Sequence, residues 1–399
     1  MAKTYLRHYE ITFNDVLNAY IAWSQGESGK KNQNRVIEEY GSVNALVFEI
    51  YTEMRGRALS FRPIHRYSRR EPTNGKGRII GVESVKQQVC DYLVVTLLEP
   101  LYSAKIGFYQ VAAVEGKGQR LCRGALRRWV RDARYHVKLD VKQCYPSTSH
   151  RVVMAMYRKL VGSKDVIYVI TCLLSTYTGG GLEIGSYFSL RTMQLVLSYG
   201  YHHVESLHKV RRGKSVPLVT HQIWHMDDVL LIGTDKRNIK VAVRSLERYL
   251  WRVFRLRLKP WKIAKTSKRE ALDLGGWVVR EYRHREDRYR ATLRSGTFLR
   301  GMRAFRRFKR CPAPWHAKRC SSYWGWIRHS DSDKLITKKH LGATFAHARS
   351  VTSRADRLEA IHAKNPVSYA AGCGTRRATR RRDGRVAPSQ HRPRSQRQP

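Results

Sequence analysis

Residues 218–233 read Leu-Val-Thr-His-Gln-Ile-Trp-His-Met-Asp-Asp-Val-Leu-Leu-Ile-Gly, two apolar runs joined by a short acidic turn at Asp227 and Asp228. Apolar runs on either side of a tight turn are typical of two hairpin strands. A further apolar run at 135–141 predicts a third short strand with Asp140 near its end. These three runs therefore predict a sheet whose buried strands carry carboxylates.

The segments around these strands alternate between helix and strand patterns. Helices are predicted over 150–161, 164–177, 187–205 and 239–253, and another strand over 272–280. This order of strand, helices, strand pair, helix and strand predicts an α+β fold, in which an antiparallel sheet has helices packed on one face.

The flanking segments are mainly helical. Upstream, the patterns predict short helices over 17–23 and 43–59, a hairpin over 64–80 and a helix over 83–98. Downstream, residues 297–365 are predicted to be mostly helical and strongly basic. The final stretch, 373–399, is rich in Arg, Gly, Pro, Ser and Gln, which predicts a disordered tail.

The charge balance predicts a polyanionic partner. The 399 residues include 77 Lys and Arg against 31 Asp and Glu, a net charge of +46, and aromatic residues are interspersed among the basic ones. This combination is typical of proteins that bind RNA or DNA. No apolar run approaches the ~20 residues of a membrane span, and no secretory signal or Cys-x-x-Cys pair is seen. We therefore expect a cytoplasmic protein with no membrane partner.

The carboxylates of Asp140, Asp227 and Asp228 are the strongest chemical signal. Burying an anion is unfavourable and like charges repel, so a cluster of three is stable only with cations. Mg²⁺ binds through one or two carboxylates together with substrate phosphates, and a pair of such ions can assist phosphoryl displacement. An isolated Asp-Asp pair in a hairpin is more often a simple turn. The company of other motifs favours the metal-binding interpretation here.

Five or six motifs in order resemble those of the reverse transcriptases. Lys138-Leu-Asp140-Val-Lys-Gln-Cys-Tyr145 resembles motif A, Gly181-Leu-Glu-Ile184-Gly185-Ser186 motif B, and His225-Met-Asp-Asp228 motif C. Residues 256–262 resemble motif D, Leu274-Gly-Gly-Trp277 resembles the motif E primer grip, and Gly75-Lys-Gly-Arg78-Ile-Ile80 resembles the fingers segment. The chain departs from the usual motifs at His225, where Tyr is common, and at Glu183, where Pro is common.

The resemblance implies a role for each matching residue. It implies catalysis by Asp140, Asp227 and Asp228, which with the Val141 carbonyl would hold two Mg²⁺ ions, for which Mn²⁺ could substitute. The residues implied in nucleotide binding are Lys76, Arg78, Tyr145, Ile184, Gly185 and Lys262. Lys259 and Lys265 lie close to Lys262 in the sequence and are equal alternatives for its role. The residues expected to contact nucleic acid are Gly276 and Trp277 of the primer grip and Arg303, Arg306 and Arg307 of the basic helical segment.

The same resemblance implies a right-hand polymerase fold. Its expected parts are fingers with N-terminal helices at 1–134, a palm with motifs A to E at 135–285, a helical basic thumb at 286–370 and the Arg-rich tail at 371–399. The expected partners are template RNA, an RNA/DNA hybrid, deoxynucleoside triphosphates and an accessory protein of the retroelement.

Two segments indicate a subclass of reverse transcriptase. Ile184-Gly185-Ser186 and the segment 322–335 resemble the enzymes of diversity-generating retroelements, which are prokaryotic or phage-encoded and copy RNA inaccurately at adenine. Phage-defence, retron-like and group II intron-like reverse transcriptases are alternatives. A polymerase-like scaffold that binds RNA without catalysis is an alternative from a different class, since its charge would look the same.

Overall fold

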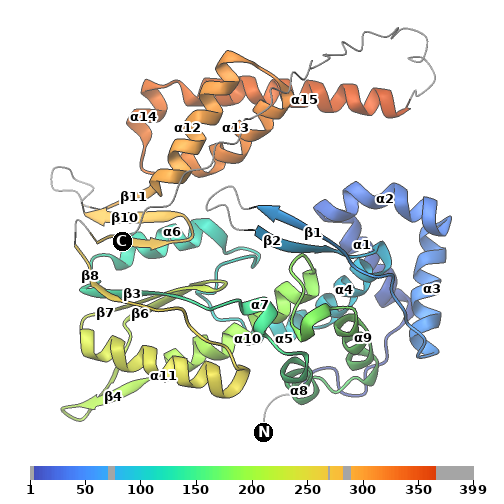
Figure 1. The fold of residues 1–399 in the computed structure, drawn as a ribbon, viewed down its shortest axis with the longest axis horizontal. Coiled ribbons are helices and arrows are strands. Elements are labelled where there is room, and N and C mark those ends of the chain that lie inside the picture. Colours follow the sequence, from blue (N-terminus) through green and yellow to red (C-terminus); the bar gives the residue numbers. More distant parts are fainter. Residues whose placement is uncertain (1–3, 71–76, 268–269, 282–288, 365–399) are drawn as a thin grey trace, which may run out of the picture.

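The computed structural model describes residues 4–70, 77–267, 270–281 and 289–364, and it has an α+β fold with antiparallel sheets, as predicted (Figure 1). The main sheet has four strands in the order β6 (His221–His225), β7 (Asp228–Gly233), β3 (Tyr135–Asp140) and β8 (Ile263–Lys265). Each strand is antiparallel to its neighbour. The predicted strands at 135–141, 218–225 and 229–233 are thereby confirmed, within a few residues.

Helices cover one face of this sheet, as expected. They include α11 (Lys236–Phe254) and α10 (Tyr187–Glu205), which pack against each other. The apolar side of α11 buries Ile239, Val243 and Leu246 in a first core that includes Val229 and Leu231 of β7. The predicted helix over 239–253 forms because its apolar residues recur every three or four positions and meet this face.

The other face of the sheet is also covered, which the sequence did not predict. Helix α6 (Gly118–Trp129) shares a second core with this face, and α6 contributes Cys122 and Leu126 to it. Leu230 and Ile232 of β7 point into this second core, whereas their neighbours point into the first. Because successive side chains of a strand alternate between faces, the unbroken apolar run of β7 serves both cores.

The N-terminal part is a helical assembly around α4 (Val85–Leu97). It comprises α1 (Phe13–Gln25), α2 (Glu27–Tyr40), α3 (Val43–Arg55) and α5 (Glu99–Lys105), and it leads to α8 (His150–Leu160) and α9 (Lys164–Ser175). Helix α4 contacts α1, α9 and α10 and is buried on several sides. The helices predicted over 17–23, 43–59, 83–98, 150–161, 164–177 and 187–205 are confirmed.

Two hairpins extend from this body. Strands β1 (His65–Arg70) and β2 (Gly77–Val82) pair antiparallel over their full length, which confirms the hairpin predicted over 64–80. Strands β4 (His208–Arg211) and β5 (Lys214–Pro217) form a second hairpin, between α10 and β6. The short helix α7 (Cys144–Ser147) follows β3 directly.

The single strand predicted over 272–280 is wrong. The chain forms β9 (Leu272–Leu274) and β10 (Trp277–Glu281), which pair with each other, and β10 also pairs with β11 (Tyr289–Leu293). Gly275 and Gly276 have φ angles of 57° and 89° and turn the chain back between the first two strands. Glycine adopts such angles without steric strain, so the Gly-Gly pair ends one strand and begins another.

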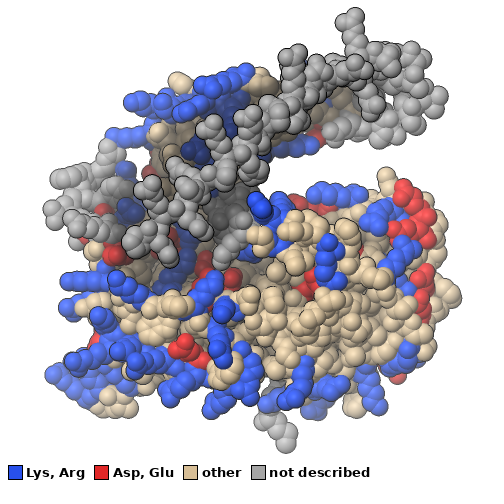
Figure 2. All heavy atoms as spheres, in the orientation of Figure 1, with Lys and Arg blue, Asp and Glu red and all other residues tan. Residues whose placement is uncertain are grey.

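The C-terminal part is helical, as predicted, and consists of α12 (Ser295–Arg310), α13 (Pro314–Ile327), α14 (Asp333–Lys338) and α15 (Leu341–Lys364). Its apolar residues belong to the second core together with α6 and β9–β11. Figure 2 shows a hollow between these helices and the body below. No helix in the described parts of the chain is long and apolar enough to cross a membrane. The tail predicted over 371–399 lies outside the described residues.

Candidate active site

Three predicted carboxylates meet at one end of the main sheet. Asp140 and Asp228 lie directly opposite each other on β3 and β7. The backbone N–H of Val141 donates to the carbonyl of Asp227 over 3.1 Å. Met226, with a φ angle of 54°, turns the chain between β6 and β7 and brings the two acidic residues to this edge. The structure thus brings together residues that are 87 positions apart in the chain.

The three carboxylates affect one another electrostatically. Burial raises the pKa of Asp227, and the like charges of Asp228 and Asp140 raise it further, while the positive charge of Arg78 opposes the shift. The mutual repulsion means that a cation at this edge would be bound favourably.

Lysines supply positive charge at this edge. The Lys259 Nζ lies 2.7 Å from Oδ1 of Asp140 and donates a hydrogen bond to Oδ2 over the same distance. The Lys138 Nζ lies 3.6 Å from Oδ1 of Asp228. The hydrogen bond to Asp140 raises the pKa of Lys259. The predicted Lys262 is exposed and lines a cavity of about 620 Å³ with His136 and Lys138, so in this segment Lys259, rather than Lys262, contacts a site carboxylate.

The carboxylates at this edge are the type of side chain that binds a hard divalent cation. Across the described ranges, no group of three or more His, Cys, Asp or Glu side chains is arranged to hold a metal as it stands. Oδ1 of Asp140 is nevertheless buried and accepts no hydrogen bond of good geometry. Carboxylate oxygens are the ligands that Mg²⁺ prefers, and a lysine beside one of them is a counter-ion that a metal could displace.

Two residues predicted to bind the nucleotide, Arg78 and Tyr145, lie beside this edge. Arg78, on β2, lies close enough to both Asp227 and Tyr145 for its charge to influence their pKa values. Tyr145, in α7, is half-buried, and burial raises its pKa. Its carbonyl accepts a hydrogen bond from the N–H of Leu182 over 2.9 Å. Lys76 lies outside the described residues.

The loop 181–186 is fixed against the β1–β2 hairpin. The N–H of Gly81 donates to the carbonyl of Ile184 over 2.8 Å, and Ile184 itself is half-buried. Gly185 has a φ angle of 121°, and a Cβ at this position would lie 2.3 Å from the carbonyl oxygen of Gly81. Only glycine permits this approach, so the backbone of the loop packs directly against strand β2.

Glu183, where the motif usually has Pro, forms a buried ion pair. Both Nε and Nη2 of Arg66, on β1, donate to Oε2 of Glu183, over 3.1 and 2.7 Å. Glu183 is 8% exposed. The departure from the motif therefore has a structural role, since the pair ties the loop to the hairpin.

Two buried acids at the start of α10, Asp91 and Glu83, were not predicted from the sequence. Oδ2 of Asp91 accepts hydrogen bonds from Ser186 Oγ over 2.7 Å and from the N–H of Phe188 over 2.9 Å. Burial raises the pKa of Asp91 to about 6, and burial beside Asp91 raises the pKa of Glu83. One signal in the sequence could have revealed this buried group: Asp91 is an acid within the apolar pattern of the helix predicted over 83–98.

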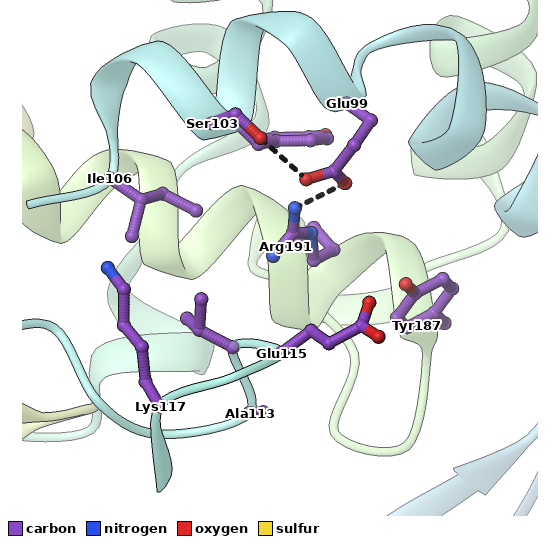
Figure 3. A pocket seen from close by; sticks show the side chains of 10 residues that line it. Glu99, Ser103, Ile106, Ala113, Glu115, Lys117, Tyr187 and Arg191 are labelled. Carbon is purple, nitrogen blue, oxygen red and sulfur yellow. Dashed lines mark hydrogen bonds and ion pairs between the residues drawn. The ribbon is translucent and has the colours of Figure 1, made fainter. Parts of the chain in front are cut away.

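Figure 3 shows a cavity of about 490 Å³ between α5, α10 and the loop before α6. The buried side chain of Arg191 crosses it, donating to Oε2 of Glu99 over 2.6 Å and to Oε1 of Gln194 over 2.9 Å. Glu99 also accepts from Ser103 Oγ over 3.0 Å. The bond between Arg191 and Glu99 anchors α10, the helix that follows loop 181–186, to α5.

The residues predicted to contact nucleic acid differ in exposure: Trp277 is buried, whereas the arginines of α12 are exposed. Trp277 is only 2% exposed, and its Nε1 donates to Oε1 of Gln119 over 3.0 Å, so its ring packs in the second core. A Cβ on Gly276 would lie 3.0 Å from the ring of Trp326. The predicted arginines of α12 are exposed on the side away from buried Phe305 and Phe308. These arginines are Arg303, Arg306 and Arg307.

Comparison with known proteins adds no family assignment. No protein-family model matches the chain, and no curated protein matches it significantly. The function is therefore inferred from the geometry: three carboxylates at one sheet edge, with an arginine and a half-buried tyrosine beside them.

Proposed function

We propose that the protein is a reverse transcriptase, which copies template RNA into cDNA by two-metal-ion nucleotidyl transfer. The observation that carries the proposal is the pairing of Asp140 with Asp228 across β3 and β7, with Asp227 hydrogen-bonded to Val141. The motif order agrees with this function, and so does the strand order of the main sheet, which is that of a β-α-β-β-α-β unit. In this proposal the sheet is a palm, the β1–β2 hairpin belongs to the fingers and α12–α15 form a thumb.

The proposed chemistry assigns each side chain a task. Asp140, Asp227 and Asp228, with the Val141 carbonyl, would hold Mg²⁺, which supplies charge neutralisation at the reacting phosphate. Arg78 would bind phosphate oxygens of the deoxynucleotide, since a guanidinium can donate two parallel hydrogen bonds. Tyr145 would lie beneath the sugar and exclude a 2′-hydroxyl. Lys259, which already donates to Asp140, would be the proton donor in place of Lys262.

The partners follow from this proposal. Template RNA and the RNA/DNA hybrid would occupy the hollow seen in Figure 2, with Arg303, Arg306 and Arg307 on phosphates. We further propose a prokaryotic cytoplasmic setting and a diversity-generating retroelement, with its accessory protein. The half-buried apolar side chain of Ile184 beside Gly185 supports that subclass, because it offers no hydrogen bond to a nascent base pair. Accurate copying of template adenines, found by sequencing the cDNA, would contradict the subclass alone.

The decisive experiment is primer extension. The purified chain should lengthen a DNA primer on an RNA template with deoxynucleotides and Mg²⁺, and chelation should stop the reaction. Asp228→Asn should lower the rate by at least about 10³-fold, as expected when a group acting on the transition state is lost. Glu38→Gln, exposed on α2, is the control and should extend at the parental rate.

A second candidate is an RNA-binding scaffold without catalysis. The ion pair between Lys259 and Asp140 favours it, because a lysine can neutralise the carboxylate without metal. A scaffold would bind RNA and extend no primer under any divalent cation. An unchanged RNA affinity in Asp228→Asn, combined with loss of extension, would exclude the scaffold.

A further inference from the structure

The outer side of α11 carries a continuous row of positive charge. The 19-residue helix has six cations and a single acid, Glu247, in its sequence. The cations are all exposed, and five of them recur at every fourth residue. They are Lys236, Arg237, Lys240, Arg244, Arg248 and Arg252. We call this set the α11 row.

The stability of the helix does not explain this row. Like charges four residues apart face each other on a helix surface and destabilise it. Over the described residues, no ion pair to a carboxylate is found for any member of the α11 row. The helix is already held by its apolar side, through residues such as Ile239, Leu246 and Leu250. Some cations do interact favourably, Arg237 with the Asp235 cap and Arg252 with the C-terminal end of the helix, but the run of like charges between them fits an anionic ligand.

The row is extended at both ends. Beyond the C-terminus of α11, the guanidinium groups of Arg255 and Arg257 lie 5.4 and 4.4 Å from the ring centre of Trp251, which is 41% exposed. At the other end, the β4–β5 hairpin presents exposed cations next to an exposed Val210. These cations are Arg211, Arg212 and Lys214. An aromatic ring among cations is a feature of surfaces that bind nucleic acid.

The positive charge is not simply spread evenly over a basic protein. Helix α2 is also exposed, but it mixes Lys30, Lys31 and Arg35 with acids, and Arg35 pairs with Glu39 over 3.0 Å. Figure 2 shows the contrast, with acids gathered at the right of the view and basic groups crowded at the lower left. Figure 1 places α11 and β4 in that lower-left region.

The α11 row is separate from the hollow that faces α12. Helix α11 covers the face of the sheet opposite α6, whereas α12 belongs to the second core on the α6 side. The row begins after Gly233, at the sheet end away from Asp228, and its continuation at Arg257 lies beside Lys142, whose N–H donates to the Arg257 carbonyl over 2.8 Å. The row therefore runs along the back of the sheet towards the candidate active site.

We infer that the α11 row, with Trp251 and the β4–β5 hairpin, is a second nucleic-acid-binding surface that holds the phosphate backbone of a structured RNA outside the catalytic hollow. RNA fits better than an anionic membrane, because no large apolar side chain of α11 other than Val241 and Trp251 is strongly exposed to enter a bilayer. This inference does not depend on polymerase activity, since a scaffold would use the surface equally.

The test measures binding of a 20-base-pair RNA hairpin to the full chain. The triple variant Lys240→Gln, Arg244→Gln and Arg248→Gln should bind at least about tenfold more weakly at 100 mM salt, and its plot of log affinity against log salt should be shallower by about 3. The variant should melt no lower than the parent, because it removes like-charge repulsion from α11.

The matched control removes the same charge from α2 through Lys30→Gln, Lys31→Gln and Arg35→Gln, and should change the affinity less than about twofold. Parental affinity and salt slope in the α11 variant would overturn the inference. Unchanged RNA binding with lost binding to phosphatidylserine vesicles would overturn it in favour of a membrane.

Should the variant fail to fold, acetylation of Lys236 and Lys240 in the parent is the second measurement. Bound hairpin should slow it, and an unchanged rate would again overturn the inference.

Discussion

The carboxyl group of Asp91, at the start of α10, binds its proton more tightly in the folded chain than in the unfolded chain. Its pKa rises from 3.8 to about 6 because the carboxyl is fully buried. A folded state that binds the proton more tightly loses stability as pH rises, so the free energy of unfolding falls between pH 3.8 and about 6 and stays lower above that range.

Asp91→Asn should remove the part of the pH dependence that Asp91 contributes, leaving the part due to Glu83, without removing the contacts. The amide oxygen can still accept the hydrogen bonds from Ser186 and Phe188, and the amide has no proton to lose. We expect the difference in Tm between variant and parent to grow as pH rises from 4 to 7, reaching about 2–4 °C, the shift for roughly 3 kcal/mol in a chain of 399 residues. Calorimetry at several pH values measures it. A difference that is constant with pH would contradict the assignment of the raised pKa to Asp91.

Lys259 should compete with any divalent cation for Asp140. Lys259→Gln removes the charge that lies 2.7 Å from Oδ1 of Asp140, so a divalent cation should bind more tightly. Because the lysine is partly exposed, we expect at most about a fivefold gain, which corresponds to about 1 kcal/mol. Titration of Mn²⁺ followed by its paramagnetic signal measures this affinity. Lys262→Gln, in the same segment but exposed, is the control, and equal affinities in the two variants would refute the competition.

At the scale of elements, Gly185 joins the loop 181–186 to strand β2. A Cβ at this position would lie 2.3 Å from a backbone oxygen, which cannot move aside as a flexible side chain can. Gly185→Ala should therefore destabilise the protein by about 2–4 kcal/mol, combining backbone strain with overpacking. Urea unfolding measures the loss.

Gly180→Ala is the matched control for this contact. Gly180 has a φ angle of 71°, so alanine is strained there too, but a Cβ would meet no atom within 4 Å. We expect a loss of about 1 kcal/mol for this variant. Equal losses in the two variants would show that the loop does not depend on its contact with Gly81.

The sequence predicted elements well where one side of the chain was apolar. The helix α11 and strands β3 and β7 follow directly from such patterns. Helix α2 was missed because its residues are mostly polar and only Gly29 and Val36 are buried. The strand predicted over 272–280 failed because apolar residues flank Gly275 and Gly276 on both sides, and the pattern alone does not reveal a reversal.

The site was predictable in its residue types and less so in its partners. The motif pattern identified Asp140, Asp227 and Asp228, which the sheet register brings together. The choice of Lys259 over Lys262 depends on which side of the segment after α11 faces the sheet, and three lysines there were equivalent in sequence. The buried position of Trp277 depends on α6 and α13 packing over it, which no local pattern encodes.

At the scale of the whole molecule, two cores share the main sheet. The second core connects α6 to the C-terminal helices, and Asp331 stands at their junction. Its Oδ1 accepts from Arg123 Nη2, in α6, over 2.7 Å, while its Oδ2 accepts from the N–H of Ala291, in β11, over 2.7 Å. One carboxylate thus joins α6, β11 and the loop between α13 and α14, in addition to the shared second core.

Asp331→Ala should loosen the C-terminal helices while leaving the rest of the fold intact. The change leaves the N–H of Ala291 and the guanidinium of Arg123 without this acceptor, at a cost of about 1–3 kcal/mol. Hydrogen exchange of α12 and α13 amides should become about 5- to 150-fold faster, the factor that corresponds to this energy, with exchange in α1 and α4 unchanged.

Asp356→Ala is the control. It removes an exposed pair with Lys318, 3.3 Å apart in the same helical part, and should change neither rate, since such pairs contribute little. Faster exchange throughout the chain would mean that the two cores unfold as one unit, and Asp331 would then stabilise the whole molecule equally.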